Sequence, residues 1–483
     1  MISNLFKKIH TRWHCEGGYK QLLSVAIPLI MSTGIISIQH CIDRVFLTWH
    51  SPEAIAAVMP AGVLCFTVMA FFIGTASYCG TFVSQYYGAG RPERIGPSIW
   101  QAVYVSIIGG AFLAGLAPFA RIFFDLVGHE PSIRELEISY FQITALGSAP
   151  AIAGSALSAF YSGRGKTWPI MWISVLSTGV NILLDYVMIF GKWGFPAMGV
   201  RGAAIATVIA SAAAVTAYLI IMGRKKYDQE FQTLSGWRFD KPLFMRLMKF
   251  GMPSGFQFFV DVAGFAFFIL LMGRLGTNAL AATNIAFNIN TLAFMPMMGL
   301  GIAVSVLVGQ YLGKDRSDLA ERSVYSAFHF ALVYMVGIAS LFVFAPNMFL
   351  SIYAAKADAA NFAAIRDTVT VLLRFLAVYT CFDSGAIIFS FAIKGAGDTK
   401  FVLYVLIASS LGIMVVPSYV VLVILERGIY AGWCVVSAFI ITLAITFTLR
   451  FLGGKWKSMR VIEEVVPVIP MTLPENPATE FDV

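Results

Sequence analysis

The sequence predicts an all-α integral membrane protein whose twelve transmembrane helices form two six-helix bundles related by a parallel pseudo-twofold repeat. The first observation is composition: of 483 residues, 58% are hydrophobic and only 12% are charged, whereas a soluble domain carries roughly 25% charged residues. The second is a series of apolar runs of about 20 residues without period-2 alternation, which favours helices over barrel strands. The third is a weak internal repeat. Because lipid cannot satisfy exposed backbone groups, the apolar surface must belong to membrane-spanning helices.

Twelve apolar segments are long enough to span a bilayer, and charged or Gly/Pro-containing loops separate them. We place the spans at residues 21–48, 54–86, 95–120, 136–160, 168–191, 199–222, 243–272, 278–312, 323–350, 368–393, 401–425 and 430–449. The predicted domains are an N-terminal six-helix bundle (1–223), a cytoplasmic linker (224–242), a C-terminal six-helix bundle (243–452) and a cytoplasmic tail (453–483). The end of this tail is rich in proline and acidic residues, so we expect the tail to be disordered.

The distribution of basic residues sets the expected orientation. With these spans, 24 of the 34 lysines and arginines lie on the side that holds both termini. The positive-inside rule then places both termini in the cytoplasm of a multi-pass protein of the plasma (inner) membrane. The basic residues are scattered over short loops, so we expect no nucleic-acid partner. The six cysteines show no paired spacing, which argues against a disulfide framework or a zinc site.

Two copies of one plan can be traced along the chain. A shift of 225 residues places VSQYYGAGRPERIGPSIWQA (83–102) over VGQYLGKDRSDLAERSVYSA (308–327), and a slightly different shift pairs SGRGKT (162–167) with KGAGDT (394–399). The first shift matches Gln85, Tyr86 and Gly88 with Gln310, Tyr311 and Gly313. Six spans per copy make the repeat parallel, as in transporters whose two bundles enclose a central cavity. An ion channel, which more often gathers its repeats around a pore, is the competing class.

Four acidic residues lie within the predicted spans: Asp43, Asp185, Asp261 and Asp383. An ionised Asp at the centre of a membrane helix costs roughly 2.5–3.5 kcal/mol on insertion scales. Each acid must therefore be protonated, paired, ion-bound or exposed to water. Two acids fall in each half of the chain, so each bundle has the residues for its own cation site.

The surroundings of the first two acids add polar groups. Asn181 precedes Asp185 by four residues, which places amide and carboxylate on one helix face as a pair of oxygen ligands. A hydrogen bond between helices is the alternative role for Asn181. His40, one turn before Asp43, is interpreted as a histidine satisfied between helices.

Flexible and aromatic side chains near Asp261 and in the eighth span are candidates for an adaptable substrate cavity. These are Phe256, Phe259, Met295 and Met298. Methionine and aromatic side chains repack readily around different ligands. The alternative role for these four side chains is contact with lipid or ordinary helix packing.

The motifs of soluble enzymes are missing. GRGKT (163–167) ends like a phosphate-binding loop, but Phe160 stands where the first glycine would be needed. The sequence contains no HExxH, G-x-S-x-G or CxxC motif. We therefore expect no enzymatic activity and no cofactor. We expect the energy for transport to come from an ion gradient.

Several local patterns recur in a specific order and spacing: HCIDRVFL (40–47), SGRGKT, NILLDYVMIFG (181–191), GVRGAAIAT (199–207), GMPSGFQFFVD (251–261), VGQYLGK and CFDSGAIIFSFAIKGAGDT (381–399). Together with the twelve-span plan, they give the chain a resemblance to the multidrug and toxic compound extrusion (MATE) family over nearly its whole length, including its NorM-like branch. The resemblance implies export of bulky, often cationic organic compounds, driven by inward movement of protons or sodium ions.

The resemblance also implies positions for the coupling ion. Carried over by position, a first-bundle site for a proton or sodium falls on Asp43, Asn181, Asp185 and Thr207. A second-bundle site falls on Asp261 and Asp383, and the first of these is commonly Glu in the NorM-like branch. The choice of ion and of bundle stays open at this point. Expected partners are a small organic substrate and membrane lipids, and the expected state is a monomer. Lipid-linked oligosaccharide flippases share the architecture, but the spans lack an array of arginines to grip a pyrophosphate.

Overall fold

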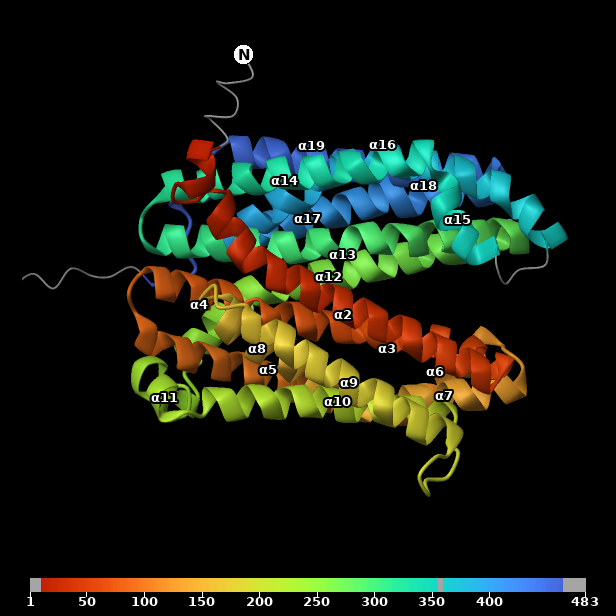
Figure 1. Cartoon of the computed structure of the whole chain (residues 1–483), viewed down its shortest axis with the longest axis horizontal. Coiled ribbons are helices and arrows are strands. Elements are labelled where there is room, and N and C mark those ends of the chain that lie inside the picture. Colours follow the sequence, from red (N-terminus) through yellow and green to blue (C-terminus); the bar gives the residue numbers. More distant parts are fainter. Residues whose placement is uncertain (1–9, 355–358, 464–483) are drawn as a thin grey trace, which may run out of the picture.

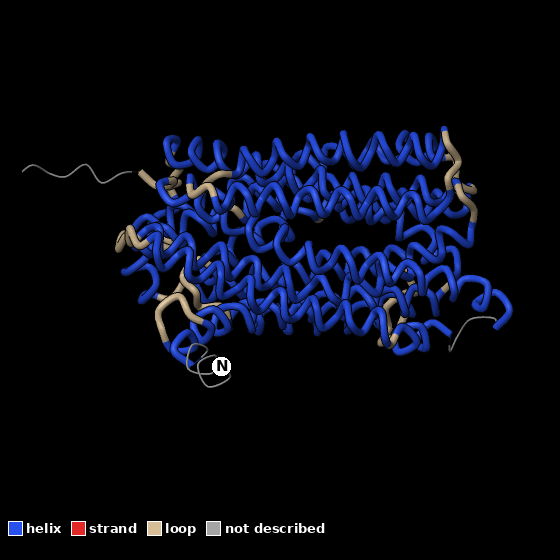
Figure 2. The backbone as a smooth tube through the Cα atoms, turned by 90° about the horizontal axis from the view of Figure 1, so that it is seen from above, coloured by secondary structure: helices blue, strands red, loops and turns tan. Residues whose placement is uncertain are grey.

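Two helical layers lie side by side in the computed structural model, which describes residues 10–354 and 359–463 (Figure 1, Figure 2). Within these residues no strand occurs. Eleven helices are long and apolar enough to cross a membrane, and a pair of helices bent by 44° makes the twelfth span. The all-α fold with twelve spans is therefore confirmed, and the protein is a multi-pass membrane protein.

The first half of the chain forms one layer. Its helices are α2 (Tyr19–His50), α3 (Pro52–Ser77), α4 (Cys79–Gly88), α5 (Ile95–Leu116), α6 (Ala120–Val127), α7 (Pro131–Leu146), α8 (Ser148–Ser162), α9 (Trp168–Phe190) and α10 (Val200–Met222). Helices α7 and α8 are the bent pair, and the bend lies at Gly147. Proline occupies the first turn of α3, α7 and α9, where its missing N–H would have no helical partner in any case.

The second half forms the other layer. Its helices are α12 (Lys241–Arg274), α13 (Thr277–Gly313), α14 (Ser317–Phe344), α15 (Pro346–Ala354), α16 (Ala359–Ala396), α17 (Thr399–Ser409), α18 (Val416–Tyr419) and α19 (Gly428–Leu452). The predicted ninth span, 323–350, ends earlier, at Phe344, because Pro346 disfavours a helical conformation at the residue before it. In the eleventh span, π-helical stretches flank α18 on both sides, next to Pro417.

The linker between the layers is structured and belongs with the first bundle. It contains α11 (Lys225–Phe231) and a 3₁₀ turn, η3 (Ser235–Trp237). Trp100 Nε1 in α5 donates to the carbonyl oxygen of Thr233 at 2.8 Å. Within the linker, Asp228 accepts the backbone N–H groups of Ser235 and Leu234 at 2.8 and 2.7 Å, and these bonds hold the pKa of its carboxyl below the ordinary value.

The expectation of a disordered tail is wrong for residues 453–463, which we name the C-terminal strap. Trp456 is buried and stacks on Phe451 with ring centroids 4.9 Å apart. At the end of the strap, the Glu463 carboxylate pairs with Arg91 at 2.7 Å and with Arg246 at 2.9 Å. Burial alone would raise the pKa of Glu463, but the Tyr86 hydroxyl and the neighbouring arginines bring this pKa below its ordinary value. Residues 464–483 lie outside the described residues.

The two bundles meet along α2, α3 and α4 of the first and α12 and α13 of the second. Glycines allow the close approach: a Cβ on Gly255 would lie 2.2 Å from the Phe71 carbonyl oxygen, and a Cβ on Gly299 would lie 2.7 Å from the Ile30 nitrogen. Such small residues permit backbone contact between membrane helices. At the end of the molecule opposite the strap, α6 and α7 pack within the first bundle, and α15 packs on α14 and α16 of the second.

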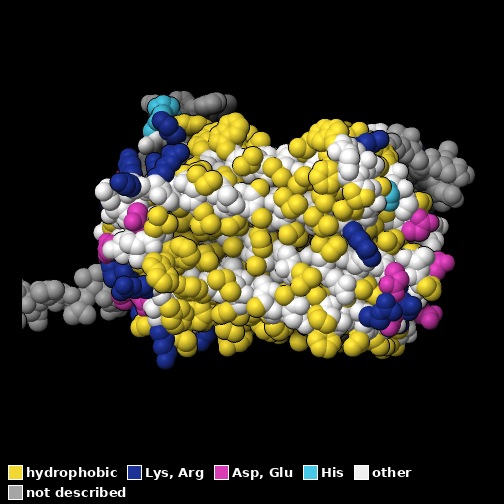
Figure 3. All heavy atoms as spheres, turned by 90° about the horizontal axis from the view of Figure 1, so that it is seen from below, with side chains coloured by type: hydrophobic (Ala, Val, Ile, Leu, Met, Phe, Trp, Pro, Cys, Tyr) yellow, Lys and Arg dark blue, Asp and Glu magenta, His cyan; other side chains and the backbone are white. Residues whose placement is uncertain are grey.

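The surface shows how the molecule sits in a membrane. On the face shown in Figure 3, hydrophobic side chains cover the middle of the molecule, and lysine and arginine side chains lie toward its two ends, with more of them at the end where the chain starts in Figure 1 and where residues 10–18 and the C-terminal strap lie. We name this the terminus-bearing end. Its basic character agrees with the positive-inside rule, which predicts that this end faces the cytoplasm.

The orientation can be tested with a cysteine at Ser235, which is exposed in the linker. In a variant without the six native cysteines, Ser235→Cys should react with a membrane-impermeant thiol reagent only after permeabilisation, because the linker faces inward. Ser351→Cys, exposed in α15 at the other end, is the matched control and should react in intact cells. The reverse pattern of labelling would show that the predicted orientation is inverted.

Candidate functional site

Two carboxyl groups face each other inside the first bundle. Asp43 comes from α2 and Asp185 from α9, and the two carboxyl groups are close enough to interact electrostatically. Asp185 is fully buried, and the Asp43 side chain is 17% exposed. Closer to the terminus-bearing end than this pair, the hydroxyls of Ser32 in α2 and Ser174 in α9 form a 2.6 Å hydrogen bond that holds the two helices together. The sequence-based prediction that these two acids belong to one site agrees with this geometry.

The polar atoms around this pair lack partners. In the described part of the chain, both carboxylate oxygens of Asp185, both amide atoms of Asn181 and one carboxylate oxygen of Asp43 are buried without a hydrogen bond. An unsatisfied buried polar atom costs about 1–3 kcal/mol, and native proteins rarely leave several together. A proton shared between the acids, or a cation held by their oxygens, would satisfy this cluster. The donor set is all oxygen apart from one amide nitrogen, which suits a hard cation.

Three further residues show what sequence reasoning did and did not foresee. Thr207 in α10 donates its hydroxyl hydrogen to the Ala203 carbonyl at 3.0 Å, so only its oxygen lone pairs are free to act as a ligand. Tyr140 in α7, which the sequence analysis missed, lies within electrostatic range of both Asp43 and Asp185. Nothing in the local sequence marks Tyr140, because its role depends on how α7 packs. The interpretation of His40 was wrong: its side chain is 63% exposed and lies 3.9 Å from Asp43.

A second group of charges lies in the second bundle. Asp261 of α12 and Asp383 of α16 are within electrostatic range of each other, and the Gln257 side chain lies close to Asp261. Lys394 of α16 also interacts with Asp261, and its Nζ lies 4.2 Å from the centre of the Phe391 ring. Sequence reasoning assigned Lys394 to a cytoplasmic loop, because the predicted span ended one residue before it. The basic neighbour of Asp261 therefore comes from another helix, whereas the basic neighbours of Asp43 are His40 and Arg44 of α2 itself.

The predicted cavity residues lie where the bundles meet. Phe256 is half-exposed and packs edge-on against Phe71 of α3, with ring centroids 5.7 Å apart, and against Phe259 at 5.9 Å. The Met295 carbonyl accepts the Thr33 hydroxyl at 3.1 Å, and Met298 is partly buried on the same helix. Their position at the boundary between the bundles fits the prediction that they line a cavity, which stays a prediction.

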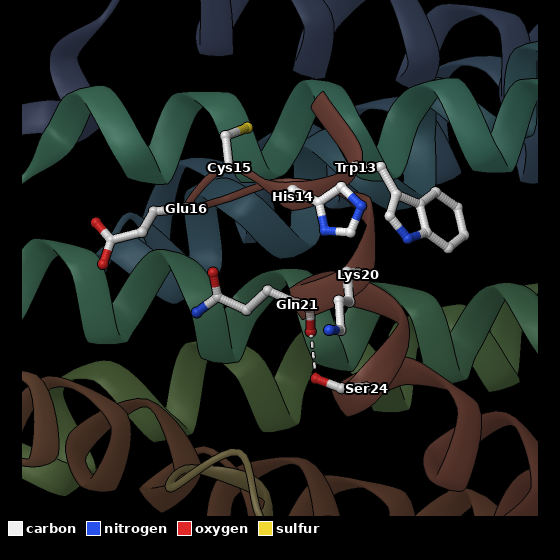
Figure 4. A pocket seen from close by; sticks show the side chains of 7 residues that line it. All are labelled: Trp13, His14, Cys15, Glu16, Lys20, Gln21 and Ser24. Atoms are coloured by element: carbon white, nitrogen blue, oxygen red, sulfur yellow. Dashed lines mark hydrogen bonds between the residues drawn. The ribbon is translucent and has the colours of Figure 1, made fainter. Parts of the chain in front are cut away.

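A shallow surface pocket lies elsewhere, at the terminus-bearing end of α2 (Figure 4). Its lining residues are Trp13, His14, Cys15, Glu16, Lys20, Gln21 and Ser24. None of the predicted site residues contributes to it. Among the described residues, no group of three or more His, Cys, Asp or Glu side chains could hold a metal ion, so the membrane acids occur as pairs.

Comparisons with known proteins bear on this arrangement. The chain is 25% identical over 470 residues to a probable multidrug resistance protein NorM from Thermotoga maritima, covering 96% of this chain and 98% of the relative. It is 28% identical over 389 residues to a probable NorM of Pasteurella multocida, covering 80% and 82% of the two chains.

Solved structures share the fold. An outward-facing conformation of a multidrug resistance MATE family transporter matches with a TM-score of 0.81 at 20% identity, over 90% of this chain and 96% of that one. A MOP superfamily transporter from Pyrococcus furiosus Vc1 also matches with a TM-score of 0.81 at 20% identity, over 91% and 97%. The MatE family model matches residues 28–187 and 253–420, one segment in each bundle. The chain therefore belongs to the MatE family and is a NorM-like transporter.

Proposed function

We propose that this protein is a cation-coupled antiporter that exports bulky, often cationic organic compounds by alternating access. The observation that carries the proposal is the buried Asp43–Asp185 pair with its unpaired polar atoms. Two like charges this close repel each other in a low-dielectric interior unless a proton or a cation lies between them. The names of the NorM relatives support export of drugs.

The position of α2 connects this pair to the bundle interface. On one side α2 packs on α9, where the Thr178 hydroxyl donates to Gln39 at 3.0 Å, one turn from Asp43. On the other side α2 packs on α13 of the second bundle, through Ile30 against Gly299 and Thr33 against Met295. A change in repulsion between α2 and α9 therefore acts on the helix that separates the coupling site from the cavity. Ion binding would move α2 relative to α13 and alter the space available to substrate.

Protons and sodium ions make different demands on this cluster. A proton needs only the two carboxyl groups, because one of them can donate to the other. Sodium needs several oxygens, and the Asn181 amide oxygen and the Thr207 hydroxyl oxygen would complete its shell. In either case the ion is a transported substrate. We further propose that the protein acts as a monomer in the inner membrane with both termini in the cytoplasm.

Replacement of Asp43 tests the coupling role. In proteoliposomes, Asp43→Asn should abolish gradient-driven efflux of a dye such as ethidium, with equilibrium binding of the dye changed less than about threefold, because the amide removes a titrating group without removing bulk. Asp318→Asn, at an exposed acid, is the matched control and should transport normally. Normal uphill transport by Asp43→Asn and Asp185→Asn, with loss of transport in Asp261→Asn or Asp383→Asn, would place the coupling site in the second bundle.

The two neutral oxygens distinguish the coupling ions. If sodium is coupled, Asn181→Ala and Thr207→Ala should each raise the sodium concentration for half-maximal transport by about tenfold, the effect of roughly 1.4 kcal/mol of lost ligand interaction. Thr216→Ala is the matched control, because Thr216 lies on the same helix, makes the same bond to the carbonyl four residues earlier and is exposed. If both site variants keep wild-type transport that follows the pH gradient alone, the coupled ion is the proton.

A further inference from the structure

The matched residues of the two sequence copies meet each other at the terminus-bearing end. Gln85 of α4 donates from Nε2 to the carbonyl oxygen of Gly395 at 3.1 Å, in the second bundle. Gln310 of α13 donates from Nε2 to the carbonyl oxygen of Gly163 at 2.8 Å, in the first bundle. The two glutamines match in the repeat, and so do the segments that receive their bonds, 162–167 and 394–399. Each bundle therefore holds the equivalent segment of the other by one amide.

The two helices that carry these glutamines also cross at backbone contact. A Cβ on Gly88 would lie 2.0 Å from the Gln310 carbonyl oxygen, and a Cβ on Gly313 would lie 2.2 Å from the Gln85 carbonyl oxygen. Only glycine fits at either position without separating α4 from α13. The crossing is reciprocal, because Gly88 and Gly313 are also matched by the repeat.

The tyrosines that follow the glutamines tie down the two ends of the described chain. Tyr311 donates its hydroxyl to Gln21 Oε1 at 2.6 Å and accepts the Gly17 N–H at 3.0 Å, so the second bundle holds the start of α2. Tyr86 donates to Glu463 at 2.7 Å, so the first bundle holds the C-terminal strap. Both tyrosines are buried.

The strap adds to the same junction. The Val461 N–H donates to Gln85 Oε1 at 2.8 Å, so the Gln85 amide is satisfied on both of its atoms by the second half of the chain. Glu463 accepts from Arg91 of the first bundle and Arg246 of the second. The strap therefore bonds to both bundles and to Gln85 of the glutamine pair.

We propose that Gln85, Gly88, Gln310 and Gly313 form the gate at the terminus-bearing end. Two reciprocal latches close this end while the opposite end is open to substrate, and they must release together for the bundles to rock. The inference rests on the alternating-access mechanism proposed above. Contacts between the bundles extend from Phe66 and Phe258 near the membrane centre, whose rings lie 5.8 Å apart, to the strap. A rocking motion that opens this end must break the amide bonds, whereas internal contacts of each bundle need not change.

The gate can be tested by measuring a distance between the bundles. The separation at this end can be measured by pulsed electron–electron double resonance in a chain without native cysteines. The spin labels are attached at Lys226→Cys in α11 and Lys400→Cys in α17, which are both exposed. Gln85→Met and Gln310→Met remove the amides but keep side-chain length. Each should at least double the fraction of molecules at the longer distance, and the double variant should increase that fraction further.

The matched control is Gln101→Met. Gln101 is equally buried, but its amide donates to Pro97 within α5 and otherwise joins α5 to Arg238 and Asp240 of the linker. A distance distribution that is unchanged in the double variant, or that shifts as much in Gln101→Met, would overturn the gate. If the distribution shifts as expected and no gradient-driven efflux is found, the gate stands and the proposed antiport falls.

A second pair of variants covers the case in which the methionine variants do not fold. Gly88→Ala and Gly313→Ala retain every amide but place a methyl group against a carbonyl oxygen, so each should also favour the longer distance. Gly337→Ala in α14 is the control, because its Cβ would meet no atom within 4 Å. Unchanged distances in both alanine variants would contradict the close crossing on which the gate depends.

Discussion

The first half of the chain must accommodate two carboxyl groups inside a bundle that is surrounded by lipid, and its other features depend on this constraint. Asp43 and Asp185 lie on different helices. His40 and Arg44 interact with Asp43 from its own helix, whereas the charged group that acts on Asp185 is Asp43 itself, so we propose that a proton or cation from outside the protein stabilises the pair. Burial of such a pair would be costly if it served only packing. Under the proposed antiport mechanism this cost would be the source of coupling, because occupancy by the ion would change the force between α2 and α9. In the second bundle the basic neighbour comes from another helix, since Lys394 of α16 interacts with Asp261 of α12.

Helix α2 connects the Asp43–Asp185 pair to the terminus-bearing end, where the proposed gate lies on α4 and α13. Asp43 lies in the half of α2 farther from the terminus-bearing end, whereas Gly17, just before α2, and Gln21, in its first turn, are held by Tyr311 of the second bundle. Helix α2 thus contacts the coupling site, the boundary between the bundles and the closed end of the molecule. Pro28 lies between these regions and removes one helical hydrogen bond. Helix α2 therefore lacks one hydrogen bond between the part that carries Asp43 and the part that Tyr311 holds.

The sequence was sufficient for the spans and for the pairing of Asp43 with Asp185, because insertion in lipid imposes length, apolar composition and a strong cost on buried charge. It was not sufficient for contacts that depend on how helices face each other. Tyr140 looks like any other tyrosine until α7 packs against the acids, and Lys394 looks like a loop residue until α16 extends past it. The repeat identified Gln85 and Gln310 as equivalent, but their partners, Gly395 at the end of α16 and Gly163 just after α8, lie more than a hundred residues away in the sequence. The strap was misread because Trp456 and Glu463 gain their partners only from the folded bundles.

Infrared difference spectroscopy of the carboxyl groups tests the central claim most directly. Purified protein in lipid is titrated with acid, or with sodium at fixed pH, and the C=O stretch of protonated carboxyl groups is followed. The account predicts a band that disappears on deprotonation or sodium binding, is missing in a variant with both Asp43→Asn and Asp185→Asn, and persists in a variant with both Asp261→Asn and Asp383→Asn. A band that survives loss of the first pair and disappears with the second would contradict the claim that the first-bundle pair holds the coupling ion.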